Sequence, residues 1–270
     1  MSNKQIGVAL ITGASSGIGL ATAKALQQAG YRVFGTSRRA VASTGGITML
    51  TCDVTDEVSI KNTVAEVLKQ AVRIDLLVNN AGIGLLGGAE ESSTAQAQAL
   101  FDVNVFGITR VTNAVLPTMR SQGKGRIVNI SSVLGLIPSP YNALYAATKH
   151  AVEGYSESLD HELRTFGIRV VLVEPGLTRT SFEESLTRPD QPLAVYDSVR
   201  ADMAALMRNG VNAGDAPEVV ASMVLKAATD ATPRRRYTAG KLAHQVSLMR
   251  RFLPEGMVDK NLRKFNNLPV

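Results

Sequence analysis

Residues 8–28 read VALITGASSGIGLATAKALQQ, and this stretch decides the fold. An apolar run at residues 8–12 leads through a glycine-rich turn into a helical pattern that starts at residue 18. Glycines at such a turn let the backbone approach a phosphate, and the helix N-terminus offers free N–H groups and a positive dipole. We therefore predict a pyrophosphate cradle; an ordinary glycine-rich turn is the alternative, because the spacing is not G-x-G-x-x-G. The predicted contacts are Gly13, Ser15, Ser16, Gly17, Ile18 and Gly19.

Short apolar runs and longer helical patterns alternate along the rest of the chain. Continuous apolar runs are typical of strands covered on both faces, and strand–helix alternation predicts parallel pairing. We expect an α/β fold, a Rossmann-type doubly wound parallel sheet of about seven strands with helices on both faces. The predicted strands are residues 8–12, 32–36, 48–51, 74–78, 126–130 and 169–174, with a weaker one at 236–238. The predicted helices are residues 18–28, 57–71, 95–119, 144–165 and 217–229.

No linker rich in Pro, Gly or Ser divides the chain, so residues 1–270 are expected to form a single domain. Residues 176–212 are the longest irregular stretch in this pattern. A long segment of that kind in a compact domain is usually a lid or a binding loop, so we predict a substrate lid there.

The 270 residues carry a net charge of +6 that is unevenly placed. Residues 231–270 hold nine Lys or Arg and two Asp or Glu, a balance of +7, so residues 1–230 sum to −1. A neutral body argues against a nucleic-acid binder, which more often carries a basic face.

The one cysteine, Cys52, excludes an intrachain disulfide and suits a cytoplasmic protein. No apolar run approaches the roughly 20 residues that span a bilayer, and no zinc-ligand spacing is present.

The second predicted strand is followed by Ser37, Arg38 and Arg39, and no acidic residue stands at its end. At this point of a dinucleotide-binding sheet, an Asp or Glu bonds the ribose of NAD, whereas an Arg accommodates the 2′-phosphate of NADP. A guanidinium suits a phosphate by its charge and its forked geometry. The stretch predicts NADP(H) as the cofactor; a solvated pair of loop arginines is the alternative.

Tyr145 and Lys149 lie four residues apart in a helical pattern, which places them on one face. An ammonium beside a phenol lowers the pKa of the phenol and makes it a usable general acid or base. Ser132 follows the strand at 126–130, and polar or glycine-rich residues follow the strands at 74–78 and 169–174. Ligands of open α/β sheets bind outside these carboxyl ends, so the sequence predicts one crevice there.

With these motifs the chain resembles the short-chain dehydrogenase/reductase family, in its single-domain branch. The motifs occur in the family's order, and the resemblance covers about residues 6–240. The tail also resembles, more weakly, the branch that contains 17β-hydroxysteroid and retinol dehydrogenases. The matching motifs are Thr12-Gly13-x-x-x-Gly17-Ile18-Gly19, Asn79-Asn80-Ala81-Gly82, Asn104, Ser132, Tyr145-x-x-x-Lys149 and Pro175-Gly176-x-Thr178.

The resemblance implies that Tyr145 exchanges a proton with the substrate oxygen and that Ser132 polarises this oxygen. It implies that Lys149 lowers the pKa of Tyr145 and bonds the nicotinamide ribose. Asn104 would maintain a water path to Lys149; its alternative is a local hydrogen bond. For Asp53, stabilising the turn before the helix at 57–71 is the alternative to a cofactor contact. The implied cofactor contacts are Asp53, Val54, Asn80, Ala81, Gly82, Tyr145, Lys149, Pro175, Gly176 and Thr178.

These features predict an NADP(H)-dependent oxidoreductase for a lipophilic carbonyl or alcohol. Apolar side chains flank the strand ends and fill the lid region, although a purely local core is the alternative. Competing functions are a reductase of acyl-carrier or small polyol substrates and a non-catalytic NADP-binding sensor. The predicted pocket wall is Leu85, Leu86, Leu134, Ile137, Tyr141, Leu177, Phe182, Leu186, Val195, Tyr196, Met203 and Met207, with Arg179, Arg188 and Arg200 as candidate partners of an anionic substrate.

The basic tail, residues 241–270, begins with Leu242, Val246, Met249 and Leu253 at helical spacing. We favour a helix that closes one side of the substrate pocket. A basic amphipathic helix on an anionic membrane is the alternative. The family resemblance further implies that the helices at 95–119 and 144–165 pair subunits into a homodimer or homotetramer.

Overall fold

The structure, a computed structural model, describes residues 5–180, 182 and 186–266. Residues 181 and 183–185 of the predicted lid and residues 267–270 of the predicted tail lie outside the described residues. So do residues 1–4, which precede the first strand.

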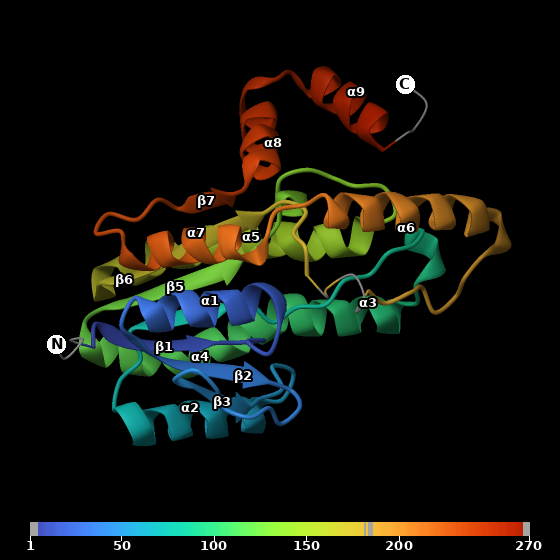
Figure 1. Ribbon diagram of the computed structural model, residues 1–270. Helices are drawn as coiled ribbons and strands as arrows, with labels where there is room; N and C mark the ends of the chain where they lie inside the picture. The colour runs from blue at the N-terminus through green and yellow to red at the C-terminus, as the bar shows by residue number, and fades with distance from the viewer. Residues whose placement is uncertain (1–4, 181, 183–185, 267–270) are drawn as a thin grey trace.

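Within the described part of the chain, seven strands form one parallel sheet in the order β3-β2-β1-β4-β5-β6-β7 (Figure 1). The chain starts in the middle of the sheet, builds outward to β3 and returns to the other side of β1 with β4. This confirms the predicted doubly wound α/β fold. The bounds are β1 Gly7–Ile11, β2 Tyr31–Ser37, β3 Ile47–Thr51, β4 Leu76–Asn79, β5 Gly125–Ile130, β6 Ile168–Pro175 and β7 Arg236–Ala239.

Helices cover both faces of the sheet because successive strand residues point to opposite sides. In β1, Val8 and Leu10 pack into a core with α2 (Glu57–Ala71), α4 (Gly107–Gln122) and α5 (Ala143–Leu163). Ala9 and Ile11 pack into a second core with α1 (Gly17–Gln28) and α7 (Pro217–Thr229). Strands buried on both sides in this way explain the unbroken apolar runs of the sequence.

The predicted helix at residues 95–119 is not continuous. The structure divides it into α3 (Thr94–Phe101), a π-helical turn at Asp102–Phe106 and α4. The π turn contains Asn104, whose buried side chain bonds neighbouring segments. Single π turns inside helices are often found at functional sites, so this interruption draws attention to Asn104.

The predicted lid and tail contain more helix than the sequence pattern indicated. Residues 176–212 were expected to be irregular, but a 3-10 turn at Ala194–Tyr196 leads into α6 (Asp197–Asn212). The tail forms α8 (Lys241–Phe252), as expected, and a further helix, α9 (Glu255–Phe265). Figure 1 shows α8 and α9 projecting beyond the β7 edge of the sheet. Within the described residues, no helix combines the length and apolar character that crossing a bilayer would require.

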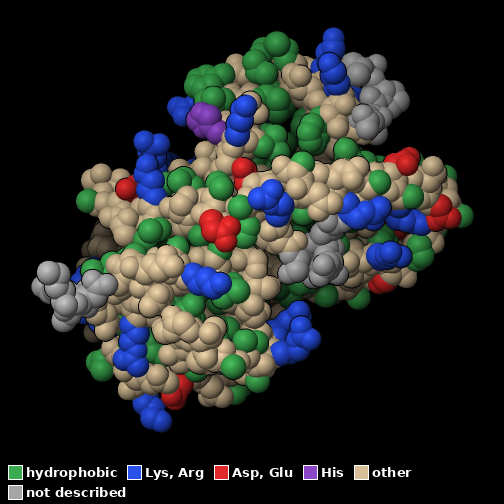
Figure 2. Space-filling view, viewed as in Figure 1, with side chains coloured by type: hydrophobic (Ala, Val, Ile, Leu, Met, Phe, Trp, Pro, Cys, Tyr) green, Lys and Arg blue, Asp and Glu red, His purple; other side chains and the backbone are tan. Residues whose placement is uncertain are grey.

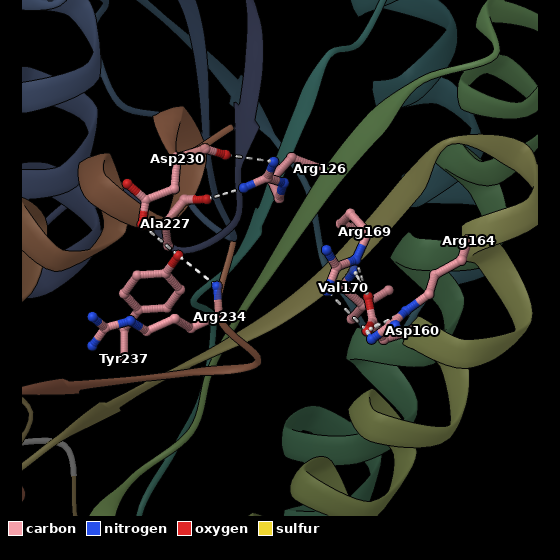
Figure 3. Close-up of polar contacts among 9 residues, drawn as sticks. All are labelled: Arg126, Asp160, Arg164, Arg169, Val170, Ala227, Asp230, Arg234 and Tyr237. Carbon is pink, nitrogen blue, oxygen red and sulfur yellow. Dashed lines mark hydrogen bonds and ion pairs between the residues drawn. The ribbon is translucent and has the colours of Figure 1, made fainter. Parts of the chain in front are cut away.

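Ion pairs brace the sheet at the amino end of β6. Asp160 of α5 accepts hydrogen bonds from Arg164, Arg169 and the Val170 backbone N–H (Figure 3). Although burial acts in the opposite direction, these bonds lower the pKa of Asp160 to about 2. The carboxylate therefore stays ionised and fixes α5 to the sheet.

A second brace joins α7 to the same end of the sheet. Arg126 donates to the carbonyl oxygens of Ala227 and Asp230, at the end of α7. The Tyr237 hydroxyl donates to the Asp230 carboxylate over 2.7 Å (Figure 3). Both braces lie at the amino ends of their strands, so the carboxyl ends are free to form a binding site.

Candidate active site

A cavity of about 1950 Å³ opens along the carboxyl ends of the strands. Ligand pockets usually measure roughly 300–1,000 Å³, so this one has room for two ligands. Every cofactor contact predicted from the sequence lines it, as do Ser132, Tyr145 and Lys149. The fourth predicted catalytic residue, Asn104, is buried behind the wall and does not line the cavity.

The glycine-rich turn after β1 forms one end of the cavity. Gly13 and Gly17 have φ angles of +66° and +53°, which disfavour other residue types. A Cβ at Gly19 would collide with the carbonyl oxygen of Gly13 and the side-chain amide of Asn80. The start of α1 carries no acidic side chain in its first turn, and Ser16 does not cap it. This cradle fits the pyrophosphate of a dinucleotide, which needs close backbone approach and free N–H groups.

Asn80 and Thr12 hold this cradle in place from the neighbouring strand ends. The Asn80 amide donates to the carbonyl oxygens of Thr12 and Gly13 over 3.0 and 2.9 Å. The Thr12 hydroxyl accepts from the backbone N–H groups of Asn80 and Ala81, both at 3.0 Å. These bonds cross from β1 to β4, where the strand order reverses and ligands of doubly wound sheets bind.

Arg38 and Arg39 stand at the end of β2, and both are exposed and line the cavity. Asp53 lies at the same end of the cavity. Its carboxylate accepts bonds from the backbone N–H and hydroxyl of Thr55, which lower its pKa, and Arg38 contributes to the same shift. Asp53 therefore stabilises its own turn, as the alternative interpretation held, and it also faces the predicted adenosine region.

Ser132, Tyr145 and Lys149 meet at the middle of the cavity. The Ser132 hydroxyl is hydrogen-bonded to Tyr145, and it accepts a bond from the Leu134 N–H over 3.1 Å. The Lys149 ammonium donates to the carbonyl oxygen of Ile130 over 3.0 Å and lies 5.6 Å from the centre of the Tyr145 ring. Phe182 packs against the same ring, with centroids 6.1 Å apart. A hydroxyl, a phenol and an ammonium thus converge on one region of the cavity.

The family model described as short chain dehydrogenase matches residues 7–191. This match spans the cradle, Ser132, Tyr145 and Lys149. The chain belongs to the short-chain dehydrogenase family. Members of this family are oxidoreductases, and structural neighbours of this chain are complexes with nicotinamide cofactors.

Among curated relatives, 3-ketodihydrosphingosine reductase of Bacteroides thetaiotaomicron is 36% identical over 264 residues, covering 96% of this chain and 97% of that protein. Retinol dehydrogenase 8 of Bos taurus is 37% identical over 252 residues, covering 84% and 80%. Among solved structures, a short-chain dehydrogenase/reductase from Burkholderia phymatum in complex with NAD has a TM-score of 0.80 at 26% identity, covering 97% of each chain. ElxO with NADP bound has a TM-score of 0.71 at 27% identity, covering 86% and 96%.

The pKa of Tyr145 in this short-chain dehydrogenase is raised, which contradicts the lowering that we expected from Lys149. Burial raises the pKa of Tyr145 well above its usual value, and the Ser132 hydrogen bond opposes this only in part. Burial also lowers the pKa of Lys149 to about 8. The ammonium lies over the phenol ring and donates to the carbonyl oxygen of Ile130, and it is not among the causes of the shift in the Tyr145 pKa. At neutral pH, Tyr145 is therefore protonated.

Asn104 ties the π turn to two segments that flank the site. Its amide exchanges bonds with the backbone of Ile83, with both donor–acceptor distances at 2.9 Å, and donates to the Thr148 hydroxyl over 3.2 Å. That hydroxyl donates to the Tyr145 carbonyl oxygen over 2.7 Å. These bonds reach segments 21 and 44 residues away along the chain, so they are not the local hydrogen bond of the alternative. In the structure Asn104 positions the first turn of α5, and the water path to Lys149 stays a prediction.

A buried charge cluster behind Lys149 was missed by the sequence analysis. Arg236 of β7 lies within 2.8 Å of Glu153, 2.7 Å of Glu157 and 3.0 Å of Glu174, measured from guanidinium nitrogen to carboxylate oxygen. Glu153, one helical turn after Lys149, and Glu174 at the end of β6 are both buried. Burial and the charge of Glu153 raise the pKa of Glu174 to about 8. The signal in the sequence was a lone carboxylate in the apolar run at 169–174.

Replacing Glu174 with Gln should make the stability of the protein less dependent on pH. The folded-state pKa of about 8 lies above the ordinary value of 4.5, so the stabilising neutral form is present at low pH and is lost as the pH rises to 8. Each unit of pKa difference is worth about 1.4 kcal/mol. The fall in Tm between pH 5 and 8 should therefore shrink by at least about 3 °C in Glu174→Gln, measured by calorimetry.

Glu162→Gln is the matched control, because Glu162 is exposed on α5. Titration of Lys149 lies outside this window, since its lowered pKa of about 8 affects stability only at higher pH. Equal pH dependence of the melting temperature in wild type and Glu174→Gln would contradict the assignment of a neutral Glu174.

The apolar half of the cavity contains part of the predicted wall. Leu85, Leu86, Tyr141, Val195 and Tyr196 do not line it. Leu85 is buried elsewhere, and Tyr141 and Tyr196 pack on each other with centroids 6.2 Å apart. Those that do line the cavity are Leu134, Ile137, Leu177, Phe182, Leu186, Met203 and Met207.

Helices α8 and α9 close the cavity of this short-chain dehydrogenase on the side away from the cradle. Leu242, Val246 and Met249 of α8 line the cavity and pack on Leu134 and Ile137. Leu262 and Phe265 of α9 line the same space, as does Asn266, which follows the helix. The apolar stripe predicted in the tail is therefore part of the cavity wall.

Proposed function

We propose that the protein reduces a long-chain or otherwise lipophilic ketone with NADPH, and catalyses the reverse oxidation of the alcohol when cofactor ratios favour it. One observation carries this proposal: the cavity joins a dinucleotide cradle to a large apolar chamber, and Tyr145 lies between them. The relative that reduces 3-ketodihydrosphingosine, a name that denotes a ketone, supports a lipid substrate.

Ser132, Tyr145 and Lys149 account for the proton transfer in such a reduction. Ser132 donates a hydrogen bond to the carbonyl oxygen of the substrate, and Tyr145, protonated at neutral pH, donates the proton that converts this oxygen to a hydroxyl. Lys149 holds a positive charge beside the phenol, and it would bond the ribose of a bound cofactor. When bound, the nicotinamide supplies the hydride. The intact set of Ser132, Tyr145 and Lys149 favours an enzyme over a cofactor-binding sensor.

The chamber favours an apolar substrate over an anionic one. Arg179, Arg188 and Arg200 do not line the cavity. Arg200 is instead engaged by the buried carboxylate of Glu91 and by Asp197. Lys241 is the cation that α8 contributes to the lining. With these arginines placed elsewhere, a phosphorylated or carboxylated substrate would have Lys241 beside it but would lack the forked hydrogen bonds that an arginine supplies.

The choice of NADP(H) rests on the end of β2. Arg38 and Arg39 line the cavity, and Ser37 occupies the position where an acidic side chain would bond the ribose of NAD. Both guanidiniums are exposed, so they can take up a phosphate without losing a buried partner.

The test is NADPH oxidation, followed by absorbance, with a panel of ketones of increasing chain length that includes 3-keto amino lipids, and with NADH in parallel. We expect turnover with NADPH, with KM falling as the chain lengthens and fills the apolar chamber. Turnover restricted to short polyols or to carrier-bound acyl groups would contradict the proposal. Tight NADPH binding with no turnover of any carbonyl would favour the sensor.

A further inference from the structure

Exposed apolar side chains gather on the α8–α9 hairpin, which we define as residues 241–266. Among the described residues, fourteen large apolar side chains are exposed, and five of them belong to this hairpin. They are Leu248, Phe252, Leu253, Met257 and Phe265, with exposed fractions from 37% to 68%. Single exposed apolar residues are ordinary, but a gathering of them marks a binding surface.

These residues differ from the apolar stripe that the sequence analysis singled out. Leu242, Val246 and Met249 face inward, onto the 3-10 turn at Val133–Gly135 and the cavity. Leu248 and Phe252 lie one turn apart on another face of α8 and remain exposed. The helix therefore closes the cavity with one face and presents a second apolar face to the outside. The interpretation of the tail as a wall of the pocket applies to the inner face and leaves the outer face without an assigned role.

Basic side chains accompany the exposed apolar residues along the hairpin. The hairpin carries six Lys or Arg and two Asp or Glu, a net charge of +4, and all eight side chains are exposed. Figure 2 shows Lys and Arg beside hydrophobic side chains on the projecting lobe that Figure 1 labels α8 and α9. Apolar residues fringed by cations are typical of helices that lie in the interface of an anionic membrane.

The exposed face is continuous with the cavity. Leu253 and Phe265 are exposed at the surface of the hairpin, and both also line the cavity. A lipid that reached this face would meet apolar side chains from the surface to the chamber beside Tyr145.

We propose that the outer face of the α8–α9 hairpin docks on an anionic lipid membrane and that the lipid substrate enters the cavity from that membrane between α8 and α9. The second half rests on the proposed function, whereas the docking does not. A second copy of the chain fits the face less well, because a twofold interface would set two charges of +4 against each other. An acidic carrier protein would pair with the cations but would leave the exposed apolar side chains without a role.

The test is co-sedimentation of the full chain with phosphatidylcholine vesicles, with and without phosphatidylserine, at two salt concentrations. Wild type should sediment with the anionic vesicles and less so at high salt. The double variant Phe252→Glu/Met257→Glu should bind about ten-fold more weakly, since it removes two inserted side chains and adds two negative charges. The control Val58→Glu/Phe166→Glu makes the same change at exposed positions outside the hairpin and should bind like wild type.

Two further measurements separate docking from folding and from function. Equal NADPH binding by both variants shows that the fold and cradle are intact. Turnover of a water-soluble aryl ketone should be unchanged in Phe252→Glu/Met257→Glu, while turnover of a ketone held in anionic vesicles should fall. Vesicle binding by wild type without turnover of any ketone would support the docking and contradict the proposed function.

Three results would overturn the docking proposal. One is wild-type protein that stays in the supernatant with anionic vesicles. Another is equal sedimentation of wild type and Phe252→Glu/Met257→Glu. The third combines two findings: wild type does not bind vesicles, and light scattering shows a homodimer that becomes a monomer in Phe252→Glu/Met257→Glu. That result would make the hairpin a contact between copies of the chain.

Discussion

Replacing Tyr145 with Phe is expected to lower kcat about a thousand-fold or more, because it removes the proton donor and leaves the rest of the site in place. Phe keeps the ring that packs against Phe182 at 6.1 Å and lies beneath the Lys149 ammonium. The cradle residues do not contact this hydroxyl, so NADPH affinity should stay within a few-fold of wild type. Steady-state turnover with the best ketone of the panel, together with NADPH binding by fluorescence, measures both effects.

The control for this variant is Tyr155→Phe, on the same helix but outside the cavity lining. It should retain turnover close to that of wild type. Retained turnover in Tyr145→Phe would remove the phenol from the mechanism and leave Ser132 or water as the proton donor.

Replacing both Arg38 and Arg39 with Ala is expected to raise the KM for NADPH roughly 10- to 100-fold while leaving the KM for NADH nearly unchanged. A hydrogen bond to a charged group contributes about 1.5–3 kcal/mol, and about 1.4 kcal/mol corresponds to a factor of ten. NADH lacks the 2′-phosphate, so it loses no such bond. The ratio of kcat/KM for the two cofactors is the measurement.

Arg120→Ala is the control for charge, since Arg120 is exposed on α4 and does not line the cavity. It should leave the cofactor ratio unchanged. Equal efficiency of the wild type with NADPH and NADH would contradict the cofactor assignment, as would a parallel loss with both cofactors in the double variant.

The cofactor half of the site could be read from the sequence because its determinants are local. Gly13, Gly17 and Gly19 lie within one turn, and the apolar run before them identifies β1. Arg38 and Arg39 follow a strand whose place in the sheet is set by the alternation of elements. The structure that such a short-range pattern forms can be predicted without knowledge of the rest of the fold.

The parts that were missed depend on contacts between distant segments. Helix α6 directs its apolar residues, such as Met203 and Met207, to the cavity and buries Met203 alone among its described residues, so it lacks the regular core stripe that marks a helix. Helix α9 was not predicted because Pro254, directly before it, is typical of a helix end. Proline is nevertheless well tolerated beside the first turn of a helix. Pairing of subunits through the helices predicted at 95–119 and 144–165 stays a prediction.

The raised pKa of Tyr145 and the cluster around Arg236 could not be read from spacing alone. The sequence places Lys149 one turn from Tyr145, but only the structure shows the ammonium over the ring and bound to Ile130. Glu153, Glu174 and Arg236 come from three elements that the fold brings together. Burial decides the charge of such groups, and burial is a property of the assembled chain.

The central position of β1 also affects the chain while it is being synthesised. Ala9 pairs with Val33 on one side and with Leu76 on the other, so the second edge of β1 stays open until the ribosome has released β4. An open, apolar strand edge invites pairing with other chains. Nascent chains that stop before residue 76 would expose this edge and aggregate, whereas slightly longer ones would cover it and set the pattern for β5, β6 and β7 to add in turn.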